Sequence, residues 1–301
     1  IRLLQGRGWP VLVDEAHGSH FAAAVDPLLP SSAVTAGADL VVHSLQKSAA
    51  GLAQTGVLWL QGERVDPAAL ERSLGWLQTS SPSALLLASC ETALAEWRTP
   101  QGRRRLQDRL NEARGLKQQL CRQGLPLLDN QDPLRLVLHS GSAGISGVEA
   151  DAWLLPRGLV AELPDPATLA FCLGLARHRG LAAALHRSWR RLIQAHPGRV
   201  PQPAFEPPPL PLVASPLLPI GQAWRAASRC VPLAEAEGGI AAELLCPYPP
   251  GIPLLIPGER LDRDRIQWLL RQRRLWGEQL PASVRITDNS GSMTQTPSSR
   301  G

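Results

Sequence analysis

The stretch VLVDEAHGSHF, residues 11–21, starts as an apolar β-branched run and ends in acidic and histidine side chains. A second apolar run, ADLVVHS at 38–44, also ends in polar groups and is followed by Lys47. The residues between them read as a loop with one or two helical turns, closed by Gly37. Strand, crossover and strand in that order predict a βαβ unit of a mostly parallel sheet, with strands over 10–14 and 38–44. The expected fold class is α/β.

A third apolar run, GVLWLQ at 56–61, begins only 12 residues after Ser44. Because a parallel crossover needs about a dozen residues or more, we expect this strand to return in the antiparallel sense. Residues 84–123 are rich in Ala, Leu, Glu, Arg and Gln, and they predict long helices broken at Pro100.

The character of the sequence changes after residue 123. Strands are indicated over 132–140 and 159–165, with a short helix over 147–158 between them. A longer helix is expected over 181–195, where the sequence HPG stops it. These elements predict a second, small α+β unit.

The stretch 197–219 is so rich in proline that we expect an extended strap and no helix. A third unit begins with a helix over 221–229, and small polar residues from 286 onward predict a disordered tail. The predicted organisation is a large domain with exit helices, a small α+β domain, a strap with a C-terminal domain, and a tail: 1–123, 124–197, 198–285 and 286–301.

The formal charge of +5 raises the question of a nucleic-acid partner. Only two of the 31 basic residues are lysines, and the arginines are spread among acids and glutamines as on solvated helix faces. We therefore expect no nucleic-acid partner. No apolar run approaches the roughly 20 residues that span a bilayer, so no membrane partner is expected. Five scattered cysteines without a C-x-x-C pair favour reduced thiols and a cytoplasmic protein.

Chemistry-bearing side chains follow both leading strands. Asp14 ends the first and His17 comes just beyond it, and Ser44 ends the second and is followed by Lys47. Ligands of open parallel sheets bind outside the carboxyl ends of the strands, so these groups are expected at one site. Lysine can be tuned to act as an amine nucleophile and arginine cannot, which makes one of only two lysines informative. A surface lysine in a loop is the alternative.

Two other interpretations of these residues are less favoured. The letters DEAH at 14–17 also name a helicase class, but the chain lacks the phosphate cradle G-x-x-x-x-G-K that such an ATPase needs. Asp14, His17 and His20 are potential metal ligands, but no second cluster completes a metal shell, so no metal is expected. An acid, a histidine, a hydroxyl and a lysine together match the set that pyridoxal phosphate chemistry uses.

Four stretches carry a resemblance to a known family. They are VLVDEAHGSHF, AGADLVVHSLQKSAAGLAQTGVLWL, LQTSSPSALLLASCE and VPLAEAEGGIAAELLCPYPPGIPLLIPGE. They resemble the cofactor strand, the lysine segment, a Thr-Ser-Pro-Ser run and the C-terminal domain of the bacterial-type Orn/Lys/Arg decarboxylases, which are fold-type I pyridoxal-phosphate enzymes. The resemblance implies a partial large domain of the aspartate aminotransferase fold followed by small α+β domains.

The resemblance also implies site residues. Lys47 would form the Schiff base with the cofactor, Asp14 would pair with the pyridine nitrogen, His17 would lie near the phenolic oxygen, and Ser44 would contact the phosphate. Strand-end capping is the competing role for Asp14 and Ser44.

A further hydroxyl pair, Thr79 or Ser80, would reach a phosphate across a dimer interface, unless TSSPS is an ordinary helix start with capping serines. Gln46 stands where the family usually has histidine, and glutamine cannot carry that residue's proton. Glu15 is expected to be a bystander.

The implied function is decarboxylation of ornithine, lysine or arginine by a homodimer or higher homo-oligomer. Another pyridoxal phosphate reaction, such as transamination, and an inactive paralogue are the alternatives. Glu162, Glu243 and Glu259 are acids that would suit a distal cationic group of the substrate, although solvated glutamates are commoner. The family's front part has no counterpart in a chain beginning at Ile1, so we expect an N-terminally incomplete member that holds the cofactor poorly alone.

Overall fold

The computed structural model describes residues 1–211, 214–247, 251–276 and 280–288. The chain forms two compact units: unit 1 holds residues 1–138 and 170–191, and unit 2 holds residues 139–169 and 192–301. These boundaries do not coincide with the predicted domain limits at 123 and 197. The reason is that α5 (Pro100–Arg122) packs on β4 (Leu127–Leu128), so the chain just beyond residue 123 stays with the first unit.

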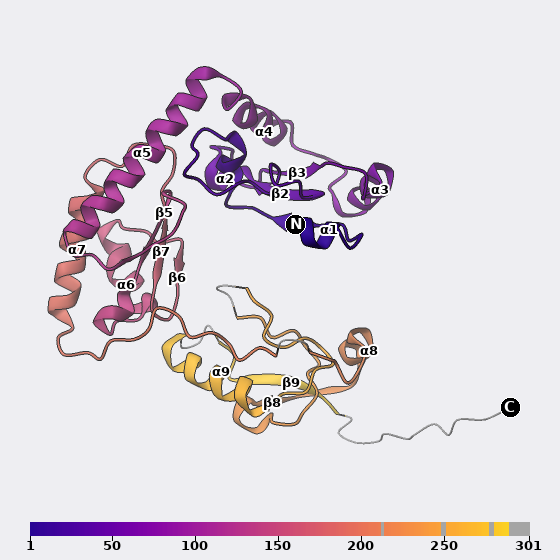
Figure 1. Cartoon of the computed structure of the whole chain (residues 1–301). Coiled ribbons are helices and arrows are strands. Elements are labelled where there is room, and N and C mark those ends of the chain that lie inside the picture. The colour runs from indigo at the N-terminus through magenta and orange to yellow at the C-terminus, as the bar shows by residue number, and fades with distance from the viewer. Residues whose placement is uncertain (212–213, 248–250, 277–279, 289–301) are drawn as a thin grey trace. The chain divides into compact units, whose positions relative to one another are not determined.

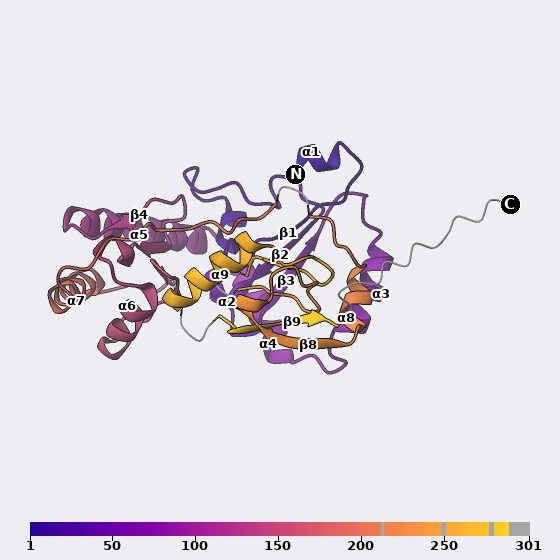
Figure 2. The same cartoon turned by 90° about the horizontal axis from the view of Figure 1, so that it is seen from below.

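Unit 1 begins with the predicted three-stranded sheet (Figure 2). Its strands are β1 (Leu12–Asp14), β2 (Leu40–Ser44) and β3 (Gly56–Leu60), in the order β1-β2-β3. The β1–β2 pair is parallel and the β2–β3 pair is antiparallel. Both predicted strand directions are therefore confirmed.

Short helical segments precede or follow these strands. They are α1 (Arg2–Gln5) before β1, the 3-10 helix η1 (Ser19–Ala23) in the crossover, and α2 (Leu45–Ser48) directly after β2. Residues of a strand alternate between the two faces of a sheet. Val41 is fully buried and packs with Val13, Trp59 and the crossover residues Ala33 and Ala38, so that face is covered by the chain itself.

Three helices follow the sheet: α3 (Pro67–Leu77), α4 (Ala84–Glu96) and α5. Figure 1 shows α4 leading into the long α5. Each has a polar N-cap, supplied by Asp66, Ser83 and Thr99, whose side chains accept backbone N–H bonds. Proline occupies the first turn of α3 and of α5, where its missing N–H costs nothing. The predicted helix break at Pro100 is confirmed.

The remaining strands of unit 1 are β4, β5 (Arg135–Leu138) and β7 (Leu169–Cys172). β4 pairs antiparallel with β5, and β7 lies on the other side of β5. The helix α7 (Leu181–Ala195) has the predicted bounds. The strand expected over 132–140 is also confirmed, although only its central residues pair.

Unit 2 contains the other elements. They are η2 (Ser140–Ala143), α6 (Gly147–Leu154), η3 (Leu155–Arg157), β6 (Leu163–Pro164), α8 (Ile220–Arg225), β8 (Ser228–Pro232), η4 (Leu233–Glu235), α9 (Arg263–Trp276) and β9 (Ser283–Thr287). β8 and β9 form an antiparallel pair whose apolar side chains pack with α9 around Leu255, Leu261 and Leu269. The described parts of the proline-rich stretch, 197–211 and 214–219, contain no helix, as predicted.

Three predictions for unit 2 are corrected. The helix expected over 221–229 ends at Arg225, because the residues from Ser228 onward pair with β9. The strand expected over 159–165 is reduced to β6. The tail was predicted to start at 286, but Ile286 and Thr287 are buried members of β9. Residues 289–301 of the predicted tail lie outside the described residues.

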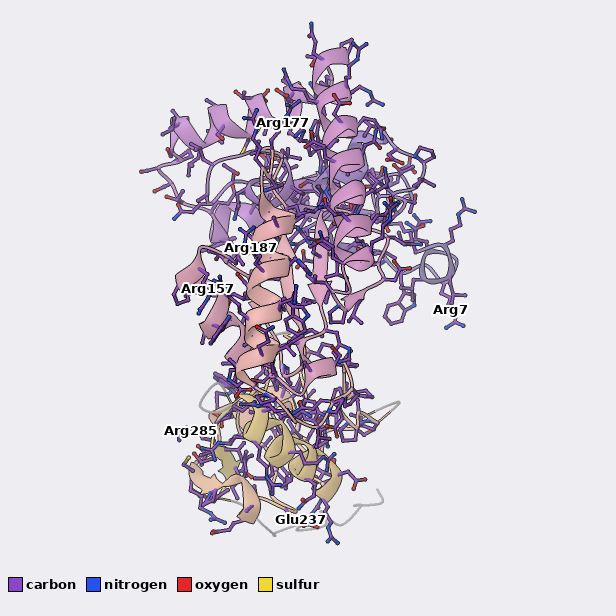
Figure 3. All side chains as sticks on the ribbon, turned by 90° about the vertical axis from the view of Figure 1, so that its left-hand side faces the viewer. Arg7, Arg157, Arg177, Arg187, Glu237 and Arg285 are labelled. Atoms are coloured by element: carbon purple, nitrogen blue, oxygen red, sulfur yellow. The ribbon has the colours of Figure 1, made fainter. Side chains whose placement is uncertain are left out.

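The arginine-rich surface is distributed over several elements. In unit 1, Arg7 projects beside α1, while Arg177 and Arg187 project from the segment that leads into α7 and from α7 itself (Figure 3). Several helix arginines pair with nearby acids, as Arg105 does with Glu96. Within the described part of the chain, no helix is both long and apolar enough to cross a membrane.

Candidate active site

The uncovered face of the β1–β2–β3 sheet presents the predicted site residues. Asp14 pairs in register with Val42, and Ser44 lies two residues further along β2. Since side chains two apart along a strand share a face, these three residues face the same side. Asp14 is exposed and Ser44 is partly exposed, unlike Val41 on the other face. The sequence therefore placed an acid and a hydroxyl on one open face.

Lys47 lies at the end of β2, in the single helical turn α2. Its Nζ is 3.0 Å from Nε2 of His17, which belongs to the loop that follows β1. Lys47 is partly exposed and His17 is exposed. The two residues lie 30 positions apart in the sequence and follow different strands. The parallel pairing of β1 and β2 brings them together.

His17 has a second partner that the sequence did not reveal. Nη2 of Arg135, the first residue of β5, lies 2.5 Å from Nδ1 of the His17 ring. Three residues further along the chain, in η1, His20 is fully buried and its Nε2 lies 3.1 Å from Oδ1 of Asp132. The segment HGSH at 17–20 is therefore tied at both ends to the segment DPLR at 132–135.

The pKa of Asp132 reflects this interlock. Burial alone would raise the pKa of its carboxyl group, but the hydrogen bond and charge of His20, the backbone N–H of Leu134 and the charge of Arg135 together hold it below the ordinary value. Asp132 therefore remains a carboxylate beside Arg135, whose Nε is 4.0 Å from its Oδ2. The only sequence signal for this arrangement is the matching spacing of three residues within each segment, and that spacing is common.

Ser44 is fixed by its backbone. Its N–H donates to the carbonyl of Ala16 at 3.2 Å, and its carbonyl accepts from Oγ of Ser19 at 3.5 Å. Ser19 also bonds Oγ of Ser48 at 2.7 Å. These contacts hold the loop after β1 against the start of α2. The Ser44 hydroxyl makes no capping bond to α2, although Ser44 is its N-cap residue.

Asp14 has one local role that the sequence left open. Its Oδ1 accepts a hydrogen bond from the backbone N–H of Ala16 at 3.0 Å, so it does cap the strand end. A carboxylate has about four acceptor positions on its two oxygens, so this bond leaves capacity for a ligand on the exposed side.

Glu15, the expected bystander of the chemistry, has a role in the fold. Its carboxylate accepts hydrogen bonds from His43 Nε2 at 2.8 Å, from Ser32 Oγ at 2.9 Å and from the Ala33 N–H at 2.9 Å. Burial alone would raise the pKa of Glu15, but these bonds, led by that of His43, hold it below its ordinary value. Trp59 Nε1 donates to Nδ1 of His43 at 2.9 Å. Indole is a donor only, so the proton of a neutral His43 sits on Nε2 and points at Glu15.

Within the described part of one chain, the structure shows no hydrogen bond of Gln46, Thr79 or Ser80 with Asp14, Ser44 or Lys47. Gln46 is exposed on α2, and Thr79 and Ser80 are exposed between α3 and α4. In the TSSPS stretch, Ser83 caps α4 through a 3.4 Å bond to the Leu86 N–H, which confirms the helix-start interpretation for that serine. The cofactor roles of Gln46, Thr79 and Ser80 stay predictions.

Two of the three acids considered for a distal substrate cation are engaged elsewhere. Glu259 is buried and pairs with Arg265 at 2.8 Å, and Glu243 accepts the backbone N–H of Arg285 at 2.7 Å. Glu162 is exposed. Over the described ranges, no group of three or more His, Cys, Asp or Glu side chains is placed to hold a metal ion.

Comparisons with known proteins identify the family of the chain. The model of the Orn/Lys/Arg decarboxylase major domain matches residues 1–138, which contain the whole site, and the model of the Orn/Lys/Arg decarboxylase C-terminal domain matches residues 204–285. The solved structure of the constitutive lysine decarboxylase of E. coli is similar to this chain with a TM-score of 0.70 and 19% identity, over 92% of this chain and 54% of that one. This likeness shows a shared α/β decarboxylase fold.

Curated relatives give the same result. The arginine decarboxylase of Bacillus subtilis (strain 168) is 31% identical over 281 residues, which cover 87% of this chain and 55% of that protein. The arginine decarboxylase of Halalkalibacterium halodurans is 29% identical over 293 residues, covering 91% of this chain and 58% of that protein. The chain thus spans a little over half the length of these relatives. Both of its matched domains, its fold and its relatives show that the chain belongs to the Orn/Lys/Arg decarboxylase family.

Proposed function

We propose that the protein catalyses pyridoxal-phosphate-dependent decarboxylation of a basic amino acid, ornithine, lysine or arginine, to the corresponding amine and carbon dioxide. The observation that carries this proposal is the meeting of Lys47 and His17 at 3.0 Å beside the open sheet face that presents Asp14 and Ser44. The proposed fold of the large domain is that of the aspartate aminotransferase type.

The donor set suits this cofactor. Pyridoxal phosphate needs an amine for its aldehyde, a carboxylate for its ring nitrogen and hydrogen-bond donors for its phosphate. Lys47 is one of two lysines in the chain, and Lys117, the other, is paired with Asp129 at 2.9 Å. Asp14 offers an exposed carboxylate already oriented by the Ala16 N–H. Ser44 lies on the same face.

Each residue then has a defined task. Lys47 Nζ supplies the amine that holds the cofactor, and Asp14 keeps a proton on the ring nitrogen by charge pairing. Ser44 donates to phosphate oxygens, and His17, which lies 3.0 Å from the amine of the lysine, lies near the phenolic oxygen. When bound, pyridoxal phosphate supplies the ring that accepts the electron pair released with carbon dioxide. A fixed charge such as Asp14 accelerates the reaction only as far as its pairing strengthens in the transition state.

A second copy of the chain is the proposed partner. The segment from the end of α3 to α4 exposes large apolar side chains, with Trp76 89% exposed, Leu77 85% and Leu85 69%. Exposed apolar patches of this kind mark interaction surfaces. Thr79 and Ser80 lie between these apolar residues, so a partner seated there would bring them to an interface. The replacement W76S/L85S should lower the association state in analytical ultracentrifugation, whereas equal association would contradict this surface.

The test of the reaction is product analysis with pyridoxal phosphate and each basic amino acid in turn. Carbon dioxide together with a diamine or agmatine is the expected outcome, and K47A should abolish it. K117A is the matched control, because it removes the other lysine outside the site and should retain activity. A keto acid in place of carbon dioxide would indicate transamination, and no product with intact cofactor binding would indicate an inactive paralogue.

A further inference from the structure

Unit 1 contains a cavity of about 470 Å³ between α5 and the segment 173–180, which joins β7 to α7. Its volume falls in the range of about 300–1,000 Å³ that small-molecule sites occupy. Arg109 and Glu112 line the cavity from α5, and Arg177 and Arg179 line it from the joining segment. None of the lining residues is a predicted site residue, so the candidate active site leaves this cavity without a role.

The floor of the cavity consists of buried apolar side chains. Leu134 and Leu173 are 1% and 4% exposed, and Ala113 and Ala182 are also buried. The Leu173 N–H donates to the carbonyl of Leu134 at 2.8 Å, which joins the two leucines through the backbone. Because this floor offers no polar side chain that a ligand would desolvate, it suits the carbon-rich body of a small molecule.

The rim of the cavity, Arg109, Glu112, Arg177 and Arg179, carries more positive charge than it balances. Arg109 pairs with Oε2 of Glu112 on the same helix, and Nε of Arg177 lies 3.7 Å from Oε1 of that carboxylate. Arg179 forms no hydrogen bond or ion pair with any described residue. Three arginines and one glutamate therefore give the rim a net charge of +2.

The charge of the rim indicates the kind of ligand. Guanidinium groups bind both carboxylates and phosphates through paired N–H donors. A carboxylate carries one negative charge, whereas a phosphate monoester carries about −1.5 to −2 at pH 7 and presents three strong acceptor oxygens. The net charge of +2 and the donors of three arginines therefore match a phosphate group better than a carboxylate.

We propose that this cavity binds a small organic phosphate: Arg109, Arg177 and Arg179 hold the phosphate group, and the apolar floor receives the body of the molecule. The Glu112 carboxylate lies between Arg109 and Arg177 and keeps these two guanidinium groups beside each other. The binding is non-covalent. It goes beyond the proposed decarboxylation, because it uses none of the predicted site residues and does not depend on the reaction that they catalyse.

The first test is isothermal titration calorimetry of the full chain with three compounds. AMP contains both parts of the proposed ligand, inorganic phosphate contains only the charged part, and adenosine contains only the body. We expect AMP to bind saturably, one molecule per chain, with a Kd at least about tenfold lower than that of either part alone. Absence of saturable AMP binding would overturn the proposal. Equally tight binding of inorganic phosphate and AMP would indicate an adventitious ion only and would also overturn it.

Paired arginine variants locate the binding site. R177M/R179M removes two guanidinium groups from the rim and should raise the Kd for AMP roughly 100-fold, about tenfold for each charged hydrogen bond lost. R187M/R190M is the matched control, because it removes two exposed arginines of α7 that do not line the cavity. Figure 3 shows Arg187 further along α7, apart from Arg177. The control should change the Kd by less than about threefold, and equal weakening in both double variants would overturn the proposed site.

A further variant tests the cavity without changing its charge. Ala183 lines the cavity and is exposed, so the large side chain of A183W takes up space in the cavity without entering the core. The Kd for AMP should rise at least about tenfold. An unchanged Kd for AMP in A183W would contradict binding in this cavity.

Melting curves from circular dichroism show whether each variant folds. If R177M/R179M does not fold, R179M alone takes its place, because Arg179 has no hydrogen bond or ion pair with the described residues to lose. R179M should then raise the Kd for AMP about tenfold, with R187M as its control. Equal Kd values for AMP in R179M and R187M would overturn the proposal.

Discussion

The two faces of the β1–β2–β3 sheet treat the same kinds of side chain in opposite ways. Asp14 and Glu15 are neighbours in sequence, yet Asp14 is exposed with one backbone hydrogen bond while Glu15 accepts three bonds around a buried histidine. The same division separates His43, which is 1% exposed, from the partly exposed Ser44 beside it. One residue step along a strand reverses the face.

The comparison of the two faces shows which polar groups have their hydrogen-bond partners within the fold. On the covered face, each polar group of the Glu15, His43 and Trp59 set has a partner within the set or the crossover loop. On the open face, polar groups retain capacity for a ligand. Buried polar groups need such partners because an unpaired one is costly. The first face therefore serves stability, and the second is available for chemistry.

The largest expected effect concerns activity on the open face. D14N should reduce kcat roughly 100- to 1000-fold, as is found when one charge-stabilising group is removed, since an amide cannot hold the ring nitrogen protonated. Thermal unfolding should barely change, because an asparagine oxygen still accepts the Ala16 N–H. Steady-state kinetics alongside melting curves check this pair of outcomes. A large loss of stability would assign Asp14 to the fold instead.

The next effect concerns stability on the covered face. E15A removes the acceptor of His43, Ser32 and the Ala33 N–H, and it should cost about 1–3 kcal/mol of unfolding free energy. Urea titration measures this cost. E91A is a matched control, because Glu91 is exposed on α4 and its loss should change stability by less than about 0.5 kcal/mol. An equal loss of unfolding free energy in E15A and E91A would contradict the structural role assigned to the covered face.

Apolar residues of neighbouring strands should show the same contrast more weakly. V41A removes two buried methyl groups and should cost about 1.6 kcal/mol at ~0.8 kcal/mol for each. L12A, on the open face where Leu12 is 63% exposed, should cost less than about 0.5 kcal/mol. Urea midpoints at constant m-value compare the two. A costly L12A would mean that the open face is covered in solution, as by a second copy of the chain.

The smallest expected effect is on acid stability. The pKa of Glu15 is lower in the folded protein than its ordinary value of 4.5, so between the two values the unfolded state binds more protons. The stability from Glu15 is therefore fully present above about pH 4.5 and is lost as the pH falls through the folded pKa. In E15Q this part of the acid dependence should vanish. Unfolding free energies from pH 6 down to pH 3 test it, and parallel curves for both proteins would contradict it.

Much of the scaffold was predictable from the sequence. The local hydrophobic pattern and the positions of Gly and Pro predict several elements. These are the two parallel strands, the antiparallel return strand, the helix break at Pro100 and the helix over 181–195. The end of the helix at Arg225 and the extent of β9 were not predictable, because both depend on the pairing of β8 with β9, which lie more than 50 residues apart.

The site was predictable only in part, for the same physical reason. Asp14 and Ser44 end the strands β1 and β2, and Lys47 follows β2, so the topology of a parallel sheet places all three at one sheet edge. The contacts of His17 with Arg135, and of Glu15 with His43, join residues 118 and 28 positions apart. No local pattern encodes these contacts. The structural role of Glu15 was not predictable either, because its partners Ser32, Ala33 and His43 lie 17 to 28 positions away.

The most direct test of the central claim uses the fact that the chain has only two lysines. The protein is incubated with pyridoxal phosphate, reduced with borohydride, digested and analysed by mass spectrometry for the pyridoxyl group. The account predicts the label on Lys47, with at least about tenfold less on Lys117, whose Nζ is held by Asp129. Equal labelling of the two lysines, or a label confined to Lys117, would contradict the assignment of Lys47 to the cofactor.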